Sequence, residues 1–239
     1  MTSNEHRLRS IVTGGAGAIG GAILSALEAR GDRVVCLDQN RPAEDGVDFV
    51  EVDISHRASV DSAVSRAVDI LGGIDVLIHS AGIIRTSKFS DLKQQEFNEI
   101  LDVNLLGAFH VAQESARYMM NSGGRIVLVT SIHGQIGVPG RSAYAASKGA
   151  VASLARVMAS ELAEHRIRVN VLAPGAVDGG MLPDPRARQG WVEATPSNRV
   201  AYLAEVAGVA AMLSSENASF VNGQIVAVDG GASTVKPII

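Results

Sequence analysis

Short apolar runs alternate with longer amphipathic stretches along the chain, and this alternation limits the possible folds more than any other feature. The runs predicted as strands are Ser10–Thr13, Arg33–Leu37, Phe49–Val52, Val76–His79, Arg125–Thr130, Arg168–Leu172 and Ile225–Val228. The stretches predicted as helices are Ile19–Ala29, Ala58–Leu71, Gln94–Met120, Ala145–Glu164 and Val200–Leu213. Such alternation is typical of a parallel sheet with both faces covered. We therefore predict an α/β fold, a single-domain doubly wound (Rossmann) parallel sheet of about seven strands over residues 1–239.

Two connections depart from this alternation. The segment Asp38–Asp48 has only 11 residues, too few for a full crossover helix, so we expect a loop or a single helical turn. The segment Asp178–Ser197 lacks periodicity and holds three prolines and the only tryptophan, Trp191. Long loops in compact domains often carry function. We expect residues 178–197 to form a loop on the substrate side.

The composition excludes several classes of function. A net charge of -4 and a pI near 5.9 give no electrostatic reason to bind nucleic acid or a membrane surface. A single cysteine, Cys36, excludes an intramolecular disulfide and a cysteine metal site, and we predict no metal. The polar start and the lack of an uncharged run of about 18 residues favour a cytoplasmic protein.

A glycine-rich turn follows the first predicted strand and opens the first predicted helix. The unpaired N–H groups and the positive dipole end of a helix N-terminus attract phosphate. We expect this turn to bind the pyrophosphate of a dinucleotide through Gly14, Gly17, Ala18, Ile19 and Gly20.

An acidic residue at the end of the second predicted strand indicates which dinucleotide binds. Asp38 lies 18 residues after Gly20, where a carboxylate can accept hydrogen bonds from the adenosine ribose, with Gln39 beside it. The same charge would repel a 2′-phosphate, so NAD is predicted and NADP is disfavoured. Arg41 would counter this preference if its loop folded back, and the alternative for Asp38 is a capped turn.

A phenol, an ammonium and a hydroxyl are the candidate catalytic groups. Tyr144 and Lys148 are four residues apart at the start of a predicted helix and share one face. A tyrosine with a pKa near ~10 is a poor base, but an adjacent ammonium and an oxidised nicotinamide would both stabilise its phenolate. Ser131 follows a strand that ends at the same sheet edge and could orient a substrate oxygen. The alternative is an exposed Tyr-Lys pair.

These residues resemble the short-chain dehydrogenase/reductase family over almost the whole chain. Thr13-Gly14-(3)-Ala18-Ile19-Gly20 is similar to the family's TGxxxGxG turn with alanine in place of the middle glycine. His79-Ser80-Ala81-Gly82 matches the Asn-Asn-Ala-Gly motif only in its last two residues, and Gly179 stands where threonine is usual. The resemblance implies further cofactor contacts at Asp53, Ile54, Ala81, Gly82, Pro174, Gly175 and Val177, besides Tyr144 and Lys148.

The resemblance also implies a mechanism. Hydride passes between the nicotinamide and a carbinol or carbonyl carbon, Tyr144 is the acid/base, and Lys148 lowers its pKa. Asn104 is similar to the family's catalytic asparagine, which positions a water beyond the lysine; without the resemblance we would interpret it as a kink or cap in a helix. Relatives assemble through the helices that correspond to Gln94–Met120 and Ala145–Glu164, so a homo-oligomer, a dimer or tetramer, is expected.

The substrate is predicted only as a class. His133, Gln135 and Arg141 lie where family members line the pocket, and their pattern resembles the 3-hydroxybutyrate dehydrogenase branch. Arginine can pair with a carboxylate, so a small hydroxy acid or a cyclic alcohol is expected; the alternative places Arg141 in solvent. Arg85 and Trp191 are further candidates.

The leading hypothesis is therefore an NAD-dependent dehydrogenase or reductase acting on CH–OH groups of a small-molecule substrate. A non-catalytic dinucleotide sensor or scaffold with the same fold is the alternative. A sugar-nucleotide epimerase also uses a Tyr-x-x-x-Lys pair, but such enzymes usually have a larger C-terminal substrate domain.

Overall fold

Seven parallel strands form one sheet in the computed structural model, which describes residues 7–43, 46–179 and 185–235. In sheet order the strands are β3 (Asp48–Glu51), β2 (Arg33–Asp38), β1 (Arg9–Thr13), β4 (Val76–His79), β5 (Gly124–Val129), β6 (Ile167–Pro174) and β7 (Ile225–Val228). The residues of the five inner strands are mostly apolar and buried, as expected for strands covered on both faces, whereas only Val50 of β3 and no residue of β7 is buried at the two edges. The predicted α/β fold with a doubly wound sheet is confirmed.

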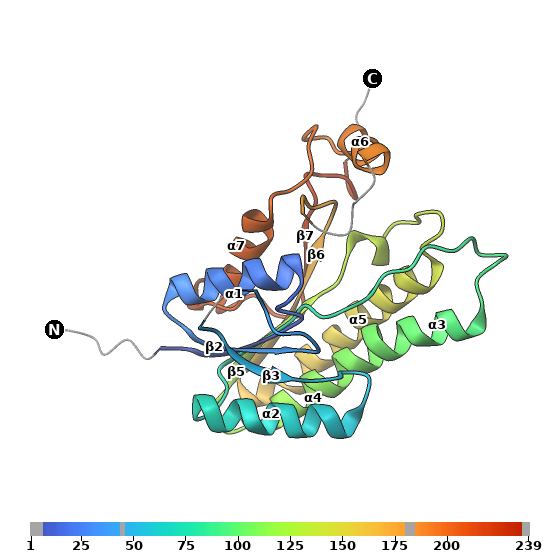
Figure 1. The fold of residues 1–239 in the computed structure, drawn as a ribbon. Coiled ribbons are helices and arrows are strands. Elements are labelled where there is room, and N and C mark those ends of the chain that lie inside the picture. The colour runs from blue at the N-terminus through green and yellow to red at the C-terminus, as the bar shows by residue number, and fades with distance from the viewer. Residues whose placement is uncertain (1–6, 44–45, 180–184, 236–239) are drawn as a thin grey trace.

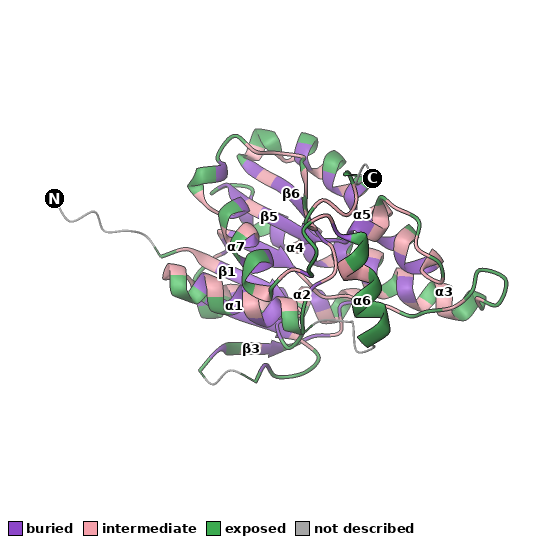
Figure 2. Ribbon diagram, turned by 90° about the horizontal axis from the view of Figure 1, so that it is seen from above, coloured by how far each residue is buried: buried purple, intermediate pink, exposed green. Residues whose placement is uncertain are grey.

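Helices cover both faces of the sheet (Figure 1). One face carries α1 (Ala18–Arg30) and α7 (Leu203–Leu213), which pack on each other and on a core that includes Val12, Ile78 and Leu172. The other face carries α2 (Arg57–Leu71), α4 (Gly107–Met119) and α5 (Ser142–Glu161). Seen from above, the buried strands lie between helices whose outer sides are exposed (Figure 2).

The strand order reverses between β1 and β4, because β1 connects to β2 on one side and the chain returns to β4 on the other. At such a switch point the loops after the two strands diverge and leave a crevice outside the carboxyl ends of the strands. Between β2 and β3, no helix forms in the described residues, as the short connection predicted.

The helix predicted over Gln94–Met120 is interrupted. It consists of α3 (Gln94–Leu101), a π-helical turn (Asp102–Leu106) and α4. Single π turns inside a helix are frequent at functional sites, and this one contains Asn104.

The loop prediction for Asp178–Ser197 is wrong in its second half, where α6 (Pro185–Ala194) forms; residues 180–184 lie outside the described residues. No residue of α6 is buried, so the helix lacks the apolar stripe by which helices are found in a sequence. In Figure 2 most of α6 is exposed.

Candidate active site

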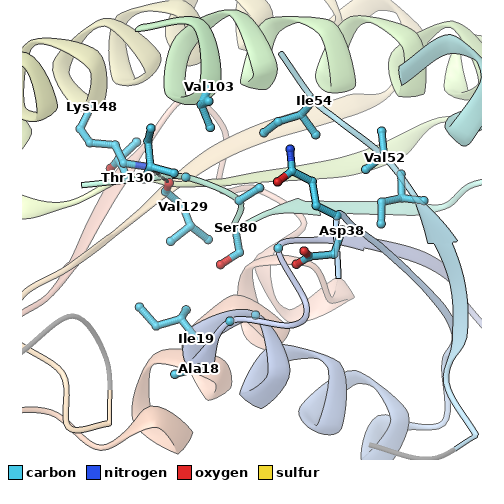
Figure 3. Close-up of a pocket in the computed structure, with 18 of the residues that line it drawn as sticks. Ala18, Ile19, Asp38, Val52, Ile54, Ser80, Val103, Val129, Thr130 and Lys148 are labelled. Atoms are coloured by element: carbon cyan, nitrogen blue, oxygen red, sulfur yellow. Dashed lines mark hydrogen bonds between the residues drawn. The ribbon is translucent and has the colours of Figure 1, made fainter. Parts of the chain in front are cut away.

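A cavity of about 470 Å³ opens at the carboxyl ends of β1, β2, β4 and β5. Figure 3 shows it with Asp38 toward one end and Lys148 toward the other. The predicted cofactor residues in its wall are Gly14, Gly17, Ala18, Ile19, Gly20, Asp38, Gln39, Asp53, Ile54, Ala81, Gly82, Tyr144 and Lys148. Segments far apart in the sequence therefore meet around one space.

Two glycines of the turn pack so closely against backbone atoms that a Cβ would not fit at Gly14 or Gly20. Gly14 has a φ of 73°, and a Cβ there would lie 2.6 Å from the Cα and N of Ala81. A Cβ on Gly20 would lie 2.0 Å from the carbonyl oxygen of Gly14. Because the backbone itself forms the wall, the N–H groups at the start of α1 are open to a phosphate in the cavity.

Asp38 is held in place by backbone N–H groups. Its Oδ2 accepts from Ala16 N at 3.0 Å, and its Oδ1 accepts from Asn40 N at 3.0 Å. Arg41 lies over the Phe49 ring, with its guanidinium carbon 5.0 Å from the ring centroid. The carboxylate thus faces the cavity from a fixed position, while Arg41 is engaged elsewhere.

Asp53 enters the wall of the cavity with its carboxylate already occupied. Asp53 Oδ1 accepts from Ser55 Oγ at 2.6 Å and from Ser55 N at 2.9 Å. The hydrogen bond from the Ser55 hydroxyl is the main reason why the pKa of Asp53 lies below its usual value. Its neighbour Ile54 is buried.

Tyr144 and Lys148 lie on the buried face of α5, where the four-residue spacing brings them together. Lys148 Nζ lies 5.7 Å from the centroid of the Tyr144 ring and donates to Val129 O at 3.1 Å. Burial lowers the pKa of Lys148 to about 8. The ammonium therefore holds a proton less tightly than a lysine in water.

Opposing effects act on the pKa of the phenol. Burial raises the pKa of Tyr144, and this effect exceeds the lowering by a hydrogen bond with Ser131 and by the charge of Arg141. The lowering expected from an ammonium and an oxidised nicotinamide together stays a prediction. Ser131 caps a short 3-10 helix (Ile132–Gly134), and its Oγ accepts from His133 N at 3.2 Å.

Asn104 ties three segments of the site together. Its Oδ1 accepts from Ile83 N at 2.8 Å, and its Nδ2 donates to Ile83 O at 2.9 Å and to Ser147 Oγ at 3.0 Å. Ser147 Oγ in turn donates to Tyr144 O at 2.7 Å. A Cβ on Gly82 would lie 3.1 Å from Asn104 Oδ1 and 3.2 Å from Lys148 Nζ, so glycine leaves room for both.

Of the predicted substrate residues, His133 and Trp191 stack on each other beside Tyr144. Arg85, Gln135 and Arg141 are exposed or bonded to other residues. His133 lies between Tyr144, with ring centroids 5.8 Å apart, and Trp191, stacked at 5.4 Å and 25°. Arg85 is exposed and pairs with Glu99 at 3.4 Å, and Gln135 is exposed. Arg141 donates to Thr86 Oγ1 at 2.5 Å, although its charge reaches both His133 and Tyr144. Trp191 comes from α6, so this segment approaches the catalytic end of the cavity.

The segment after β6 lies beside the cavity. Gly175 packs against Asp229, where a Cβ would lie 2.8 Å from the Asp229 Cβ, and Val177 pairs with Ala201. Pro174, Gly175 and Val177 are absent from the cavity wall, but Gly179 lines it. Wall residues that the sequence did not indicate are Leu37, Val52, Ser80, Ile83, Val103, Val129 and Thr130. Most of them are apolar and lie at strand ends. Their position at a strand end is the sequence signal that could have identified them as wall residues.

Within the part of the chain that the structure describes, every helix is too short or too polar to span a membrane. No group of three or more His, Cys, Asp or Glu side chains in that part is placed to hold a metal ion.

Known proteins resemble the chain over nearly its full length. A family model described as enoyl-(acyl carrier protein) reductase matches residues 14–233. The 3-oxoacyl-[acyl-carrier-protein] reductase MabA of Mycobacterium tuberculosis (strain ATCC 25618 / H37Rv) is 37% identical over 92% of this chain and 91% of its own. The residues that the family model matches include the glycine turn from Gly14 and the Ser131, Tyr144 and Lys148 region.

Two solved structures share the fold. The ligand-free aldohexose dehydrogenase of Thermoplasma acidophilum has a TM-score of 0.92 and 30% identity over 98% of this chain and 97% of its own. The gluconate 5-dehydrogenase of Burkholderia cenocepacia J2315, in complex with NADP and tartrate, has a TM-score of 0.90 and 30% identity, covering 96% of each chain. With its sheet and these relatives, the chain belongs to the short-chain dehydrogenase/reductase family of oxidoreductases.

Proposed function

We propose that this protein transfers a hydride between NAD(H) and a secondary alcohol or ketone. The observation that carries the proposal is that Tyr144 and Lys148 stand in the wall of the same cavity that Asp38 enters at its other end. A nicotinamide dinucleotide fits this wall, because the Gly14–Gly20 turn leaves a cradle that a Cβ would fill. The non-catalytic sensor is disfavoured, since Asn104, Ser131, Tyr144 and Lys148 are all present and adjacent.

In the proposed mechanism each residue has one task. The chemistry that a nicotinamide held in the cavity would supply is transfer of the hydride. Ser131 orients the substrate oxygen, and Tyr144 takes up or returns the proton on that oxygen. Lys148 provides a positive charge beside the phenol, and Asn104 fixes the backbone of Ile83 and of Tyr144 around it. Burial raises the pKa of Tyr144, and the charge of Lys148, together with that of an oxidised nicotinamide, would favour the phenolate against this effect.

Cofactor choice is tested by Asp38→Ala. Removal of the carboxylate takes away both an acceptor for the ribose hydroxyls and a charge that repels a 2′-phosphate. The ratio of kcat/KM for NAD to that for NADP is expected to fall by about 100-fold, which corresponds to ~2.7 kcal/mol. Initial rates with both cofactors measure it, and Asp48→Ala, an exposed carboxylate at the start of β3, is the control.

Preference of the wild-type protein for NADP would contradict the NAD assignment. The gluconate 5-dehydrogenase structure contains NADP, which makes this the specific alternative.

For the substrate, the stacked His133 and Trp191 rings next to Tyr144 support a small or ring-shaped compound that contacts aromatic faces. Purified protein should reduce NAD with at least one member of a panel of hydroxy acids, cyclic diols, polyols and aldoses. A 3-hydroxyacyl thioester belongs in the panel because MabA is a 3-oxoacyl-[acyl-carrier-protein] reductase. Activity with the thioester alone would replace the small-substrate proposal.

A homo-oligomer, a dimer or tetramer, is part of the proposal. Several large apolar side chains are exposed on the π turn, α4 and α5, and burying them between copies would remove them from water. They are Leu106, Phe109, Tyr118, Met120 and Val157. The single-domain organisation and the cytoplasmic location remain predictions.

A further inference from the structure

A histidine at the end of β4 occupies an unusual place for a titratable group. His79 is 1% exposed, and its register partners are Thr13 on β1 and Leu128 on β5. It lies two residues after Leu77, which belongs to the core beneath α4 and α5. Since alternate residues of a strand share a face, the ring of His79 points toward the helices that carry Asn104 and Lys148.

Within the described part of the chain, only one nitrogen of this ring has a partner. Nδ1 lies 2.8 Å from Thr13 Oγ1, which also accepts from Ala81 N at 3.3 Å. Nε2 is buried and has no hydrogen-bond partner among the described residues. Leaving a buried ring nitrogen unpaired is unfavourable, so a partner outside the protein's own atoms is expected.

The Lys148 ammonium has donors to spare on the same side of the sheet. It has three N–H bonds, and among the described residues its acceptor is Val129 O. The nearby Asn104 side chain already bonds with Ile83 and Ser147. The ammonium therefore has N–H bonds to offer to a further acceptor.

The electrostatics agree with a neutral ring close to this lysine. Burial, and then the charge of Lys148, lower the pKa of His79 to about 3. The other titratable groups around Lys148 are Tyr144 on the same helix, His133 on the adjoining 3-10 helix and Arg141 at the start of α5, while Asp102 on the π turn is exposed. At physiological pH His79 stays uncharged and offers a lone pair.

We propose that His79 is a positioning residue for Lys148, whose ammonium donates through one shared water molecule to the Nε2 lone pair of His79. In this arrangement Nδ1 carries the proton and donates to Thr13 Oγ1. The contact keeps the ammonium charged and fixed beside Tyr144, and no proton is transferred to His79. The inference rests on the proposed role of the Tyr144 and Lys148 pair.

Two substitutions separate the two ring nitrogens. An asparagine amide can replace the Nδ1 contact with Thr13 but cannot reach the position of Nε2, whereas a glutamine amide can. We expect His79→Asn to lower the pKa of Lys148 by about 0.5 to 1 unit, and His79→Gln to leave it near the wild-type value. NMR titration of ¹³C-labelled lysine side chains, assigned with Lys148→Met, measures this without catalysis.

The pH profile of alcohol oxidation gives a second readout. A less stable ammonium stabilises the Tyr144 phenolate less, so the pKa of the phenol rises. In His79→Asn the acidic limb of kcat should move to higher pH and kcat should fall by about tenfold, with the Gln variant close to wild type. The control is Ser115→Ala, which removes a buried hydroxyl that also lacks a partner among the described residues. It should change neither the acidic limb of kcat nor kcat itself.

A purely structural role for His79 would lower the melting temperature of both variants and leave the Lys148 titration unchanged. That result, or equal titration shifts in the Asn and Gln variants, would overturn the inference. Failure of the proposed function is distinct, because wild-type protein would then be inactive with every alcohol while the NMR titration still decides the role of His79.

Discussion

Tyr144→Phe is expected to reduce kcat by about 10³-fold, within the range attributed to general acid–base catalysis. The substitution removes only the hydroxyl, which is hydrogen-bonded with Ser131, and leaves the buried ring beside His133 and Lys148. Because the ring shape is kept, the cavity wall and the affinity for NADH should change little. The proton on the substrate oxygen then has no group to receive it.

Two measurements on the same variant test this prediction. Initial rates of NADH formation give kcat, and the fluorescence of NADH on titration gives the affinity. Tyr118→Phe, the same change at a partly exposed position on α4, should keep both at wild-type values. Turnover of Tyr144→Phe at the wild-type rate would exclude the phenol as the acid/base, and a wild-type protein that binds NADH without any turnover would favour the sensor.

The sheet could be predicted from the sequence because its strands are buried on both faces. The strand Val76–His79 was predicted with the bounds that the structure has. Three apolar residues and a histidine follow the polar Asp75 there and precede the Ala81-Gly82 turn. The helix α6 could not be found in this way. Its contacts with the rest of the protein include the Trp191 ring on His133 and the ion pair of Arg188 with Asp178, and such isolated contacts leave no periodic apolar pattern.

The parts of the site that could be predicted depend on residue spacing within a helix or on the position of strand ends. Tyr144 and Lys148 meet because four residues make about one helical turn, and Gly14 and Asp38 meet because β1 and β2 are parallel neighbours. The π turn at Asn104 was not predictable, because apolar periodicity continues on both sides of it. The same holds for the contacts of Arg141 with Thr86 and of His79 with Thr13, which depend on how distant segments are placed.

The balance of effects on the Tyr144 pKa could not be obtained from the sequence either. The four-residue spacing correctly places an ammonium near the phenol, but it carries no information about burial. Desolvation disfavours the phenolate, and in this site it outweighs the hydrogen bond and the charge that favour it. Residue spacing indicates which charges lie near a phenol, but it does not indicate how much water the phenol loses on folding.

Gly20→Ala is expected to produce the second large effect, a loss of dinucleotide binding by at least about 100-fold. The new Cβ would lie 2.0 Å from Gly14 O and 2.6 Å from Gly14 C, so the turn between β1 and α1 must move. Both atoms belong to the backbone, which cannot rotate away as a flexible side chain could. Any shift changes the direction of the N–H groups that we assign to the pyrophosphate, and Gly14 has little room to move because Ala81 packs closely against it.

Gly208→Ala is the matched control for this substitution. Gly208 lies inside α7 with nothing within 4 Å of its would-be Cβ, so alanine should stabilise the helix by about 0.5–1 kcal/mol. Isothermal titration with NADH and thermal unfolding, on both variants, separate binding from stability. Gly20→Ala should lose affinity while it remains folded at the temperature of the titration, because the buried members of both core clusters lie outside residues 14–20. If that variant bound NADH as tightly as wild type, the turn would not hold the pyrophosphate, and the cavity from Asp38 to Lys148 would require a different ligand.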